Sequence, residues 1–351
     1  MLPPELVRIT DLDDAWPIRS AGARLDAIRS KGRRVRDKIL ANGPARCVRT
    51  IDIATFPYPT SFGLQNTAAS PAPFVFMRNR MQLVQVVSGS NGKLLTILVN
   101  PTDSARSAAA PFFAHMEQRY GALARKLLSR FHSTIPAALS SCGVKPEAVD
   151  YITFDHLHVQ DVRGLLAPGT NGRTYLPNAK LLVQRGELDT LANLHPLQTY
   201  WYIPDAIAGI PPEKIVTLDG DYTIGAGFAL VRTPGHTAGN HTPVIVTDRG
   251  AWTISENGIC VDAYSPGTSK IRGLARHARD TGVEVILNAN TREGSLDQYT
   301  SMILEKTIAD TVPDHPEYPQ HFPSSELVGH PLAPGLSPTY SHGAITFGIP
   351  A

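Results

Sequence analysis

The chain places histidines directly after two short apolar runs of the kind that form buried strands. Residues 151–158 read YITFDHLH, and residues 228–236 read FALVRTPGH. In the second segment Pro234 and Gly235 predict a tight turn, from which His236 projects. Histidines at two strand ends are what a three-histidine metal site requires. The two segments therefore predict a sheet with a polar site at its strand ends.

The rest of the chain supports such a sheet, with helices on its outside. Residues 21–41 have helical spacing of apolar residues, whereas residues 47–100 contain three runs rich in β-branched and aromatic residues. The segment SGSNGK at 88–93 lacks the spacing of a phosphate loop, and its Asn-Gly pair predicts a hairpin turn. This pattern predicts an α/β sandwich with its site where strands end.

Further elements are expected along the second half and in an insert. Residues 104–141 carry an aromatic and aliphatic stripe typical of one or two long helices. Residues 179–194 predict a strand that runs into a helix, and residues 283–291 predict a strand before a helix at 295–310. The proline-rich tail after Pro313 predicts an arm on the body or on a neighbouring subunit.

Composition excludes several classes of function. The net charge is +2, and basic and acidic residues are mixed along the chain without a basic stripe. We therefore expect no nucleic-acid partner and no membrane partner. Three widely spaced cysteines argue against a disulfide framework, and the N-terminal residues lack the apolar core of a signal peptide. These features favour a cytoplasmic protein with reduced thiols.

The two histidine motifs resemble those of the metallo-β-lactamase fold superfamily. That family has T-H-x-H-x-D-H after one strand and T-P-G-H-T-x-G-H after a later one. Here the second motif reads TPGHTAGNH and is nearly intact, whereas the first reads FDHLHVQD and is altered. The resemblance extends over roughly residues 80–310. Within this range the segment PNAKLLVQRGEL resembles the lactonase-type and glyoxalase-type hydrolases of the family. It implies a four-layer αββα sandwich.

The resemblance also implies the ligands of a first metal. The two histidines of H-x-H and the histidine of T-P-G-H match His156, His158 and His236. The bridging aspartate of the family falls on Glu256 or Asn257, and Glu256 is the better substitute because only it carries a charge. An isolated H-x-H, in contrast, is also compatible with two polar histidines near a helix cap.

The second metal site of the family is altered at every terminal ligand. Its positions match Gln160, Asp161 and Asn290, and amide oxygens are weak ligands for zinc. We therefore expect one metal ion per chain, Zn²⁺ most of all, with Fe or Mn as the other options. Asp155 either orients a ligand histidine through its second ring nitrogen or caps the following turn. His241 matches a structural histidine of the family.

Together these residues predict a hydrolase that uses metal-activated water on a small ester, lactone or activated ether. Asp161 is the expected general base, and Glu256 is a fourth ligand or orients the water. Three alternatives remain: an O-demethylating hydrolase of aryl ethers, an iron-dependent redox enzyme, and a non-catalytic subunit of a hetero-oligomer.

The expected organisation has one principal domain with additions. It comprises an N-terminal helical extension at 1–45, the metallo-β-lactamase-like domain at 46–312 with the insert at 104–141, and a C-terminal arm at 313–351. The additions at both ends favour a homo- or hetero-oligomer.

Overall fold

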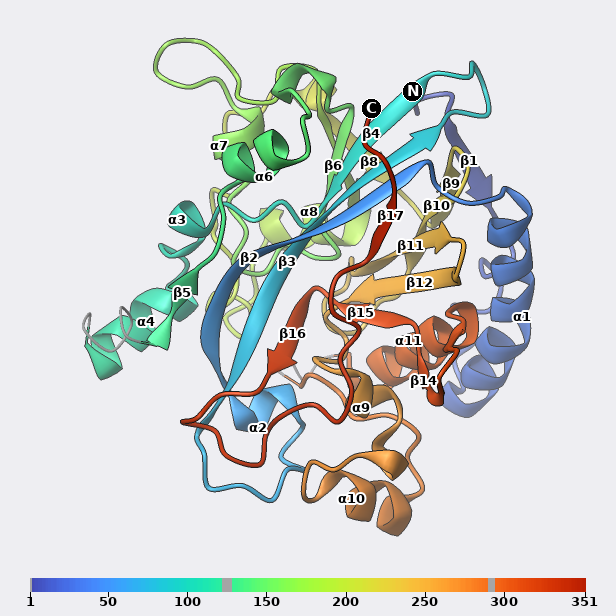
Figure 1. Cartoon of the computed structure of the whole chain (residues 1–351), viewed down its shortest axis with the longest axis vertical. Coiled ribbons are helices and arrows are strands. Elements are labelled where there is room, and N and C mark those ends of the chain that lie inside the picture. Colours follow the sequence, from blue (N-terminus) through green and yellow to red (C-terminus); the bar gives the residue numbers. More distant parts are fainter. Residues whose placement is uncertain (1, 122–127, 290–293) are drawn as a thin grey trace.

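The protein folds into two β-sheets that pack face to face between outer helices (Figure 1). This computed structural model describes residues 2–121, 128–289 and 294–351. The four layers are the αββα arrangement that the sequence predicted. Within the described part of the chain, no helix combines the length and the apolar composition that crossing a membrane requires.

Six strands form the first sheet in the order β1-β9-β10-β11-β12-β15. Their bounds are Leu6–Ile9, Asp221–Ile224, Phe228–Arg232, His241–Thr247, Gly250–Ser255 and His321–Pro323. The second sheet follows the path β17-β2-β3-β4-β6-β7-β8, with β16 paired to β3 and β5 paired to β2. In that order its strands are Thr346–Gly348, Cys47–Pro59, Phe74–Val87, Leu94–Val99, Tyr151–Thr153, Lys180–Gln184, Ile215–Leu218, Ser325–Val328 and Arg130–Phe131. A separate pair consists of β13 (Thr311–Val312) and β14 (His315–Pro319).

Helices cover the outer faces of both sheets. The described α-helices are α1 (Ala21–Ala41), α2 (Thr60–Gly63), α3 (Ser104–Ser107), α4 (Pro111–Tyr120), α6 (Ile135–Ser141), α7 (Arg163–Leu166), α8 (Arg185–Ala192), α9 (Val261–Tyr264), α10 (Leu274–Thr281) and α11 (Ser295–Ile308). Three short 3₁₀ turns lie at Pro146–Ala148, Pro212–Lys214 and Pro266–Thr268.

Three buried clusters separate the four layers. Between the sheets, Val84 and Ile97 of one sheet meet Leu230 of the other. The outer face of the six-stranded sheet packs against α1 and α11. The outer face of the larger sheet buries the third cluster, which includes the aromatic residues near the site. The sandwich is thus held by apolar burial on both faces of each sheet.

The helix expected over residues 21–41 is α1, and it lies beside α11 (Figure 1). Ser20 caps its first turn by accepting from the amide of Ala23, and Ile28 and Val35 face the sheet. A Cβ on Gly32 would lie 2.7 Å from the Leu304 side chain, so the glycine permits the close approach of the two helices. The hairpin turn at 88–93 is also confirmed, because β3 and β4 pair antiparallel across it.

The insert at 104–141 contains short helices rather than the long ones that its apolar stripe predicted. Pro111 begins α4, and Gly121 ends it with a φ of 85°. Pro136 lies in the first turn of α6, where proline starts a helix but cannot continue one. Leu123 and Leu127 of the stripe lie outside the described residues.

The tail after Pro313 is more deeply integrated than an arm on the surface. It adds β15 to the smaller sheet beside β12, and then adds β16 and β17 to the larger one. In Figure 1 this red segment passes from one sheet to the other. The strand expected at 283–291 is wrong for residues 283–289, because their amides bond outside any strand, such as Asn288 to the carbonyl of Asn257 and Ala289 to that of Phe62 in α2.

One buried carboxylate lies at the start of β9, which pairs with both β1 and β10 in the smaller sheet. Asp221 of β9 is 2% exposed and accepts from the amide of Arg232 at 2.6 Å. Burial, only partly offset by that hydrogen bond and by Arg232 and Arg8, raises the pKa of Asp221 to about 7. The folded protein therefore holds a proton that the unfolded chain releases near pH 4.

The raised pKa of Asp221 predicts that the folded protein loses stability as the pH rises from about 4 to about 7. A folded pKa above the unfolded one means that the free energy of unfolding falls as pH rises through this window, by at most roughly 4 kcal/mol for three pKa units. Asp221→Asn keeps an oxygen that accepts the hydrogen bond and removes the group that titrates. The free energy of unfolding of this variant, relative to that of the native chain, is therefore expected to be higher at pH 7.5 than at pH 4.5. Denaturant unfolding at both pH values measures this. Asp219→Asn, at an exposed position, is the control. If Asp221→Asn changes the free energy of unfolding equally at both pH values, the raised pKa of Asp221 is contradicted.

Candidate metal centre

Three buried histidines converge from two loops at the strand ends of the sandwich. His156 and His158 follow β6 of the larger sheet, and His236 follows β10 of the smaller one. Their ligand nitrogens all lie within 4.8 Å of one another, and this is the one such group of His, Cys, Asp or Glu found among the described residues. The structure therefore brings together the three histidines that the motifs predicted.

The spacing and chemistry of these nitrogens fit a zinc ion. Each Zn–N bond is about 2.1 Å, so two nitrogens on one ion lie at most about 4.2 Å apart. Tetrahedral coordination places them closer, at about 3.4 Å, so the widest pair closes by roughly 1.4 Å around an ion. Neutral imidazole is a preferred zinc ligand, and three of them leave a fourth position for another group.

The turn that carries His236 depends on Gly235. Its φ is 133°, and a Cβ there would lie 2.0 Å from the backbone nitrogen of Gln298 at the start of α11. Only glycine lets the turn fit under that helix. The ring then places Nδ1 3.4 Å from the carbonyl oxygen of Asn288, which leaves Nε2 for a ligand role.

The loop that carries the first two histidines is held in a strained conformation. Val159 follows His158 with a φ of 53°, which is rare for a β-branched residue. Its amide donates to the carbonyl of Trp201 at 2.8 Å, and this contact fixes the turn. Strain of this kind is retained where surrounding contacts define a site.

Asp155 orients the first histidine. Its Oδ1 lies 3.2 Å from Nδ1 of His156, and its Oδ2 accepts from the hydroxyl of Ser324 at 2.9 Å. Of the two roles considered for Asp155, the structure supports contact with the ligand's second ring nitrogen. Ser324 comes from the junction of β15 and β16, so the C-terminal segment supports the site.

The three imidazoles differ in the direction in which the protein shifts their pKa values. Burial lowers the pKa of His158 well below its ordinary value and that of His236 to about 3, and His156 adds to both shifts. Burial also acts against charge on His156, but the carboxylates of Asp155 and Glu256 outweigh it and raise its pKa to about 9. Two rings are therefore neutral and ready to bind a cation, and the third releases a proton when it does so.

Glu256 is the predicted site carboxylate that faces this centre. It follows β12, lines the same cavity as His156 and His158, and lies 3.5 Å from the Ser324 hydroxyl through Oε2. Burial raises its pKa to about 7, against the lowering effect of His156. Asn257 instead donates to Glu305 of α11 at 2.7 Å and does not line the cavity, whereas Glu256 does.

The other predicted residues of the altered second site are dispersed. Gln160 lines the cavity. Asp161 does not, because its carboxylate is bound by the side chain of Arg163 at 2.6 and 2.9 Å and by the Arg163 amide at 3.1 Å. This engagement argues against Asp161 as the general base. Asn290 lies outside the described residues.

His241 is separated from the cluster, as expected for a structural histidine. Its ring bonds to the hydroxyl of Thr153 at 2.9 Å, and its amide donates to the carbonyl of Asp155. It therefore connects the beginning of β11 to the loop of the first two ligands.

Sequence reasoning missed a buried carboxylate that joins both histidine loops. Glu187 of α8 accepts from the amide of Leu157 at 2.8 Å, from the hydroxyl of Thr237, and from the amide of Gly239 at 3.2 Å. It also accepts from Tyr202 at 3.1 Å. A signal was present in the glycines, because a Cβ on Gly239 would lie 2.2 Å from the Glu187 nitrogen.

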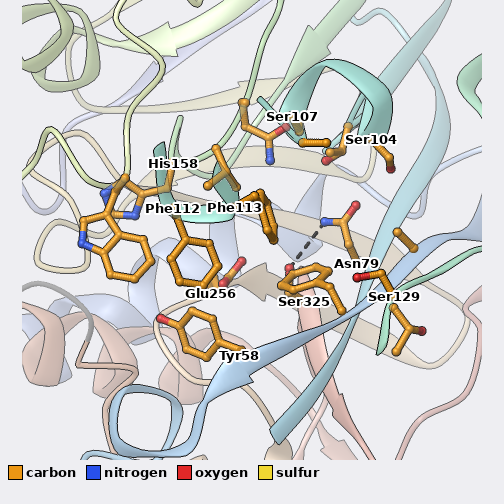
Figure 2. Close-up of a pocket in the computed structure, with 18 of the residues that line it drawn as sticks. Tyr58, Asn79, Ser104, Ser107, Phe112, Phe113, Ser129, His158, Glu256 and Ser325 are labelled. Atoms are coloured by element: carbon orange, nitrogen blue, oxygen red, sulfur yellow. Dashed lines mark hydrogen bonds between the residues drawn. The ribbon is translucent and has the colours of Figure 1, made fainter. Parts of the chain in front are cut away.

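A cavity of about 710 Å³ opens onto the histidines. Figure 2 shows its aromatic wall, with Tyr58, Phe112 and Phe113 between His158 and the polar residues of the opposite side. Phe112 stacks on Trp201, with ring centroids 4.9 Å apart. Among the described lining residues none is Lys, Arg or Asp, and Glu256 is the one acidic side chain. The cavity can therefore take an uncharged, largely apolar molecule and hold it beside the metal centre.

Comparisons with known proteins agree with this architecture. No family model matches the sequence. An N-acyl homoserine lactonase of Bacillus sp. is 30% identical over 111 residues, which cover 32% of this chain and 38% of the relative. The corresponding lactonase of Bacillus cereus is 29% identical over 115 residues, covering 33% of this chain and 40% of the relative. The matches thus span about two fifths of the length of these curated relatives.

A solved structure extends the likeness over most of the fold. The crystal structure of a probable metal-dependent hydrolase from Staphylococcus aureus has a TM-score of 0.50 and 12% sequence identity, and the alignment covers 73% of this chain and 82% of that one. Together with the αββα layers, this likeness shows that the chain has a metallo-β-lactamase-like fold, in which the two histidine motifs converge.

Proposed function

We propose that this protein is a metal-dependent hydrolase of a neutral ester or lactone with an apolar substituent. The observation that carries the proposal is the histidine cluster at the end of an apolar cavity whose one described acidic lining residue is Glu256. The partial matches to N-acyl homoserine lactonases support the lactone class.

His156, His158 and His236 would hold the ion, with Zn²⁺ as the best fit to three imidazoles. When bound, such an ion polarises a carbonyl oxygen and lowers the pKa of bound water to about 7. Asp155 keeps the His156 ring in the orientation that presents Nε2. One ion per chain is proposed because the second-site positions have no histidine.

The protein's own groups supply the rest of the chemistry. The aromatic wall of Phe112 and Trp201 orients the substituent and excludes water from the reacting bond. Glu256 takes the proton from the attacking water and passes it to the leaving oxygen. Burial favours its protonated form and so makes the carboxylate a stronger base than an exposed one.

A direct assay tests the proposal. Zinc-loaded protein is expected to hydrolyse members of a panel of N-acyl homoserine lactones and neutral phenyl esters, measured as proton release at constant pH. The apolar cavity favours longer or aromatic substituents over acetyl esters of small alcohols. Absence of turnover over the whole panel, with metal bound, contradicts the function and favours a non-catalytic subunit.

Metal content tests the ligand assignment. The purified protein is expected to retain about one equivalent of transition metal per chain after dialysis, as measured by elemental analysis. His236→Ala loses the metal and the activity, whereas His241→Ala, the matched change at an equally buried histidine, keeps the metal. Equal loss in both variants, or two equivalents in the native protein, would show that the assignment is wrong.

A pair of carboxylate-to-amide substitutions tests the base. Glu256→Gln is expected to lower kcat by roughly 10² to 10⁴, the usual cost of losing a general base. Asp161→Asn is expected to lower it by less than about tenfold, because this carboxylate is paired with Arg163. Metal content and thermal unfolding are measured for both, so that a loss of metal or of folding is separated from a loss of proton transfer. If Asp161→Asn lowers kcat more than Glu256→Gln does, Asp161 is the base instead.

A further inference from the structure

The wall of the cavity opposite the histidines contains buried oxygen atoms without partners. Among the described residues, the hydroxyls of Ser104 and Ser107 and the amide oxygens of Asn79 and Gln160 are buried and accept or donate no hydrogen bond. All four residues line the cavity. Asn79, Ser107 and Gln160 are only 7%, 3% and 8% exposed.

The orientation of the Asn79 amide is fixed by its neighbours. Its Nδ2 lies 3.5 Å from the carbonyl oxygen of Ser324 and 3.4 Å from the hydroxyl of Ser325. A carbonyl only accepts, so the NH₂ group must face Ser324, and the amide oxygen faces the other way. In Figure 2 the nitrogen of Asn79 points to Ser325 and the oxygen points away from it. The free atom is thus an acceptor.

An unpaired buried acceptor disfavours an empty or purely apolar cavity. Buried polar groups are almost always hydrogen-bonded, and one left without a partner destabilises the state that contains it. Several such oxygens in one cavity, from β3, from α3 and from the loop after His158, indicate a shared ligand. A carbonyl oxygen acceptor such as Asn79 Oδ1 requires that this ligand donate a hydrogen.

We propose that Asn79 and Ser107, with Ser104 and Gln160, form a polar subsite that binds a hydroxyl or N–H group on the apolar part of the substrate. This proposal rests on the proposed function and narrows its substrate class. The substrate is a neutral ester or lactone whose aromatic or compact apolar group lies against Phe112 and Trp201 and carries a hydrogen-bond donor. Donor-free analogues bind less well, because they leave the same oxygens unpaired.

Matched esters test the subsite. Zinc-loaded protein is assayed with 3- and 4-hydroxyphenyl acetate against the 3- and 4-fluorophenyl esters, since fluorine replaces the hydroxyl without donating. After correction for the rate in hydroxide alone, at least one hydroxyl ester is expected to exceed its fluoro partner in kcat/KM by on the order of tenfold. KM carries most of the difference, because the subsite is assigned to binding.

Two variants and a control localise the effect. In Ser107→Ala and in Asn79→Leu the hydroxyl-to-fluoro ratio is expected to fall toward one. Ser107→Ala removes no protein hydrogen bond, so it should fold normally, and thermal unfolding checks this. Ser140→Ala, at an exposed serine of α6 in the same insert, keeps the native ratio. A native ratio near one, or an equal ratio in all four proteins, overturns the subsite.

The failure of the proposed function is distinguishable from failure of the subsite. If the metal-loaded native protein hydrolyses none of these esters, binding of phenol and fluorobenzene is compared by ligand-observed NMR. Tighter binding of phenol that is lost in Ser107→Ala and Asn79→Leu upholds the subsite without the reaction. Equal binding of phenol and fluorobenzene excludes it.

Discussion

The carboxylate of Glu187 connects the parts of the molecule that the metal centre needs. It is buried in α8, and it accepts hydrogen bonds from the loop of His156 and His158 and from the loop of His236. These loops follow strands of different sheets, so no backbone ladder joins them. A charged acceptor with several donors is a strong interaction in a dry interior, and it sets the distance between the two halves of the site. Glu305 of α11 has a similar role beside the smaller sheet, because it accepts from Thr242, Ser255, Asn257 and Tyr264.

This arrangement explains which parts of the site could be predicted from the sequence. His156, His158 and His236 are found from local motifs, because each motif contains both the ligand and the turn that aims it. The αββα layers follow from the same resemblance and from the alternation of apolar runs. Elements that depend on local spacing, such as α1 and the β3–β4 hairpin, were predicted correctly for that reason.

The remaining parts depend on contacts between distant segments, which local patterns do not encode. Asp161 occupies the position of a family metal ligand, but Arg163 lies only two residues away and binds its carboxylate. The position of a residue in a motif fixes where its backbone lies and not which partner its side chain takes. Ser324 lies in a proline-rich tail without periodicity, so nothing nearby in the sequence indicated its contact with Asp155. The strand expected at 283–291 had suitable residues, but the amides of its described part bond to α2, to α9 and to the loop after β12.

The route of the C-terminal segment has a consequence for the order of events during synthesis. β15 and β16 join the two sheets late in the chain, and the serines at their junction touch Asp155, Glu256 and Asn79. All three histidines leave the ribosome well before these serines do. A nascent chain that ends before Ser324 therefore has every imidazole of the centre but lacks the hydroxyl that orients Asp155. Full assembly of the cavity thus requires β15 and β16, which can join the two sheets only after the preceding strands have paired.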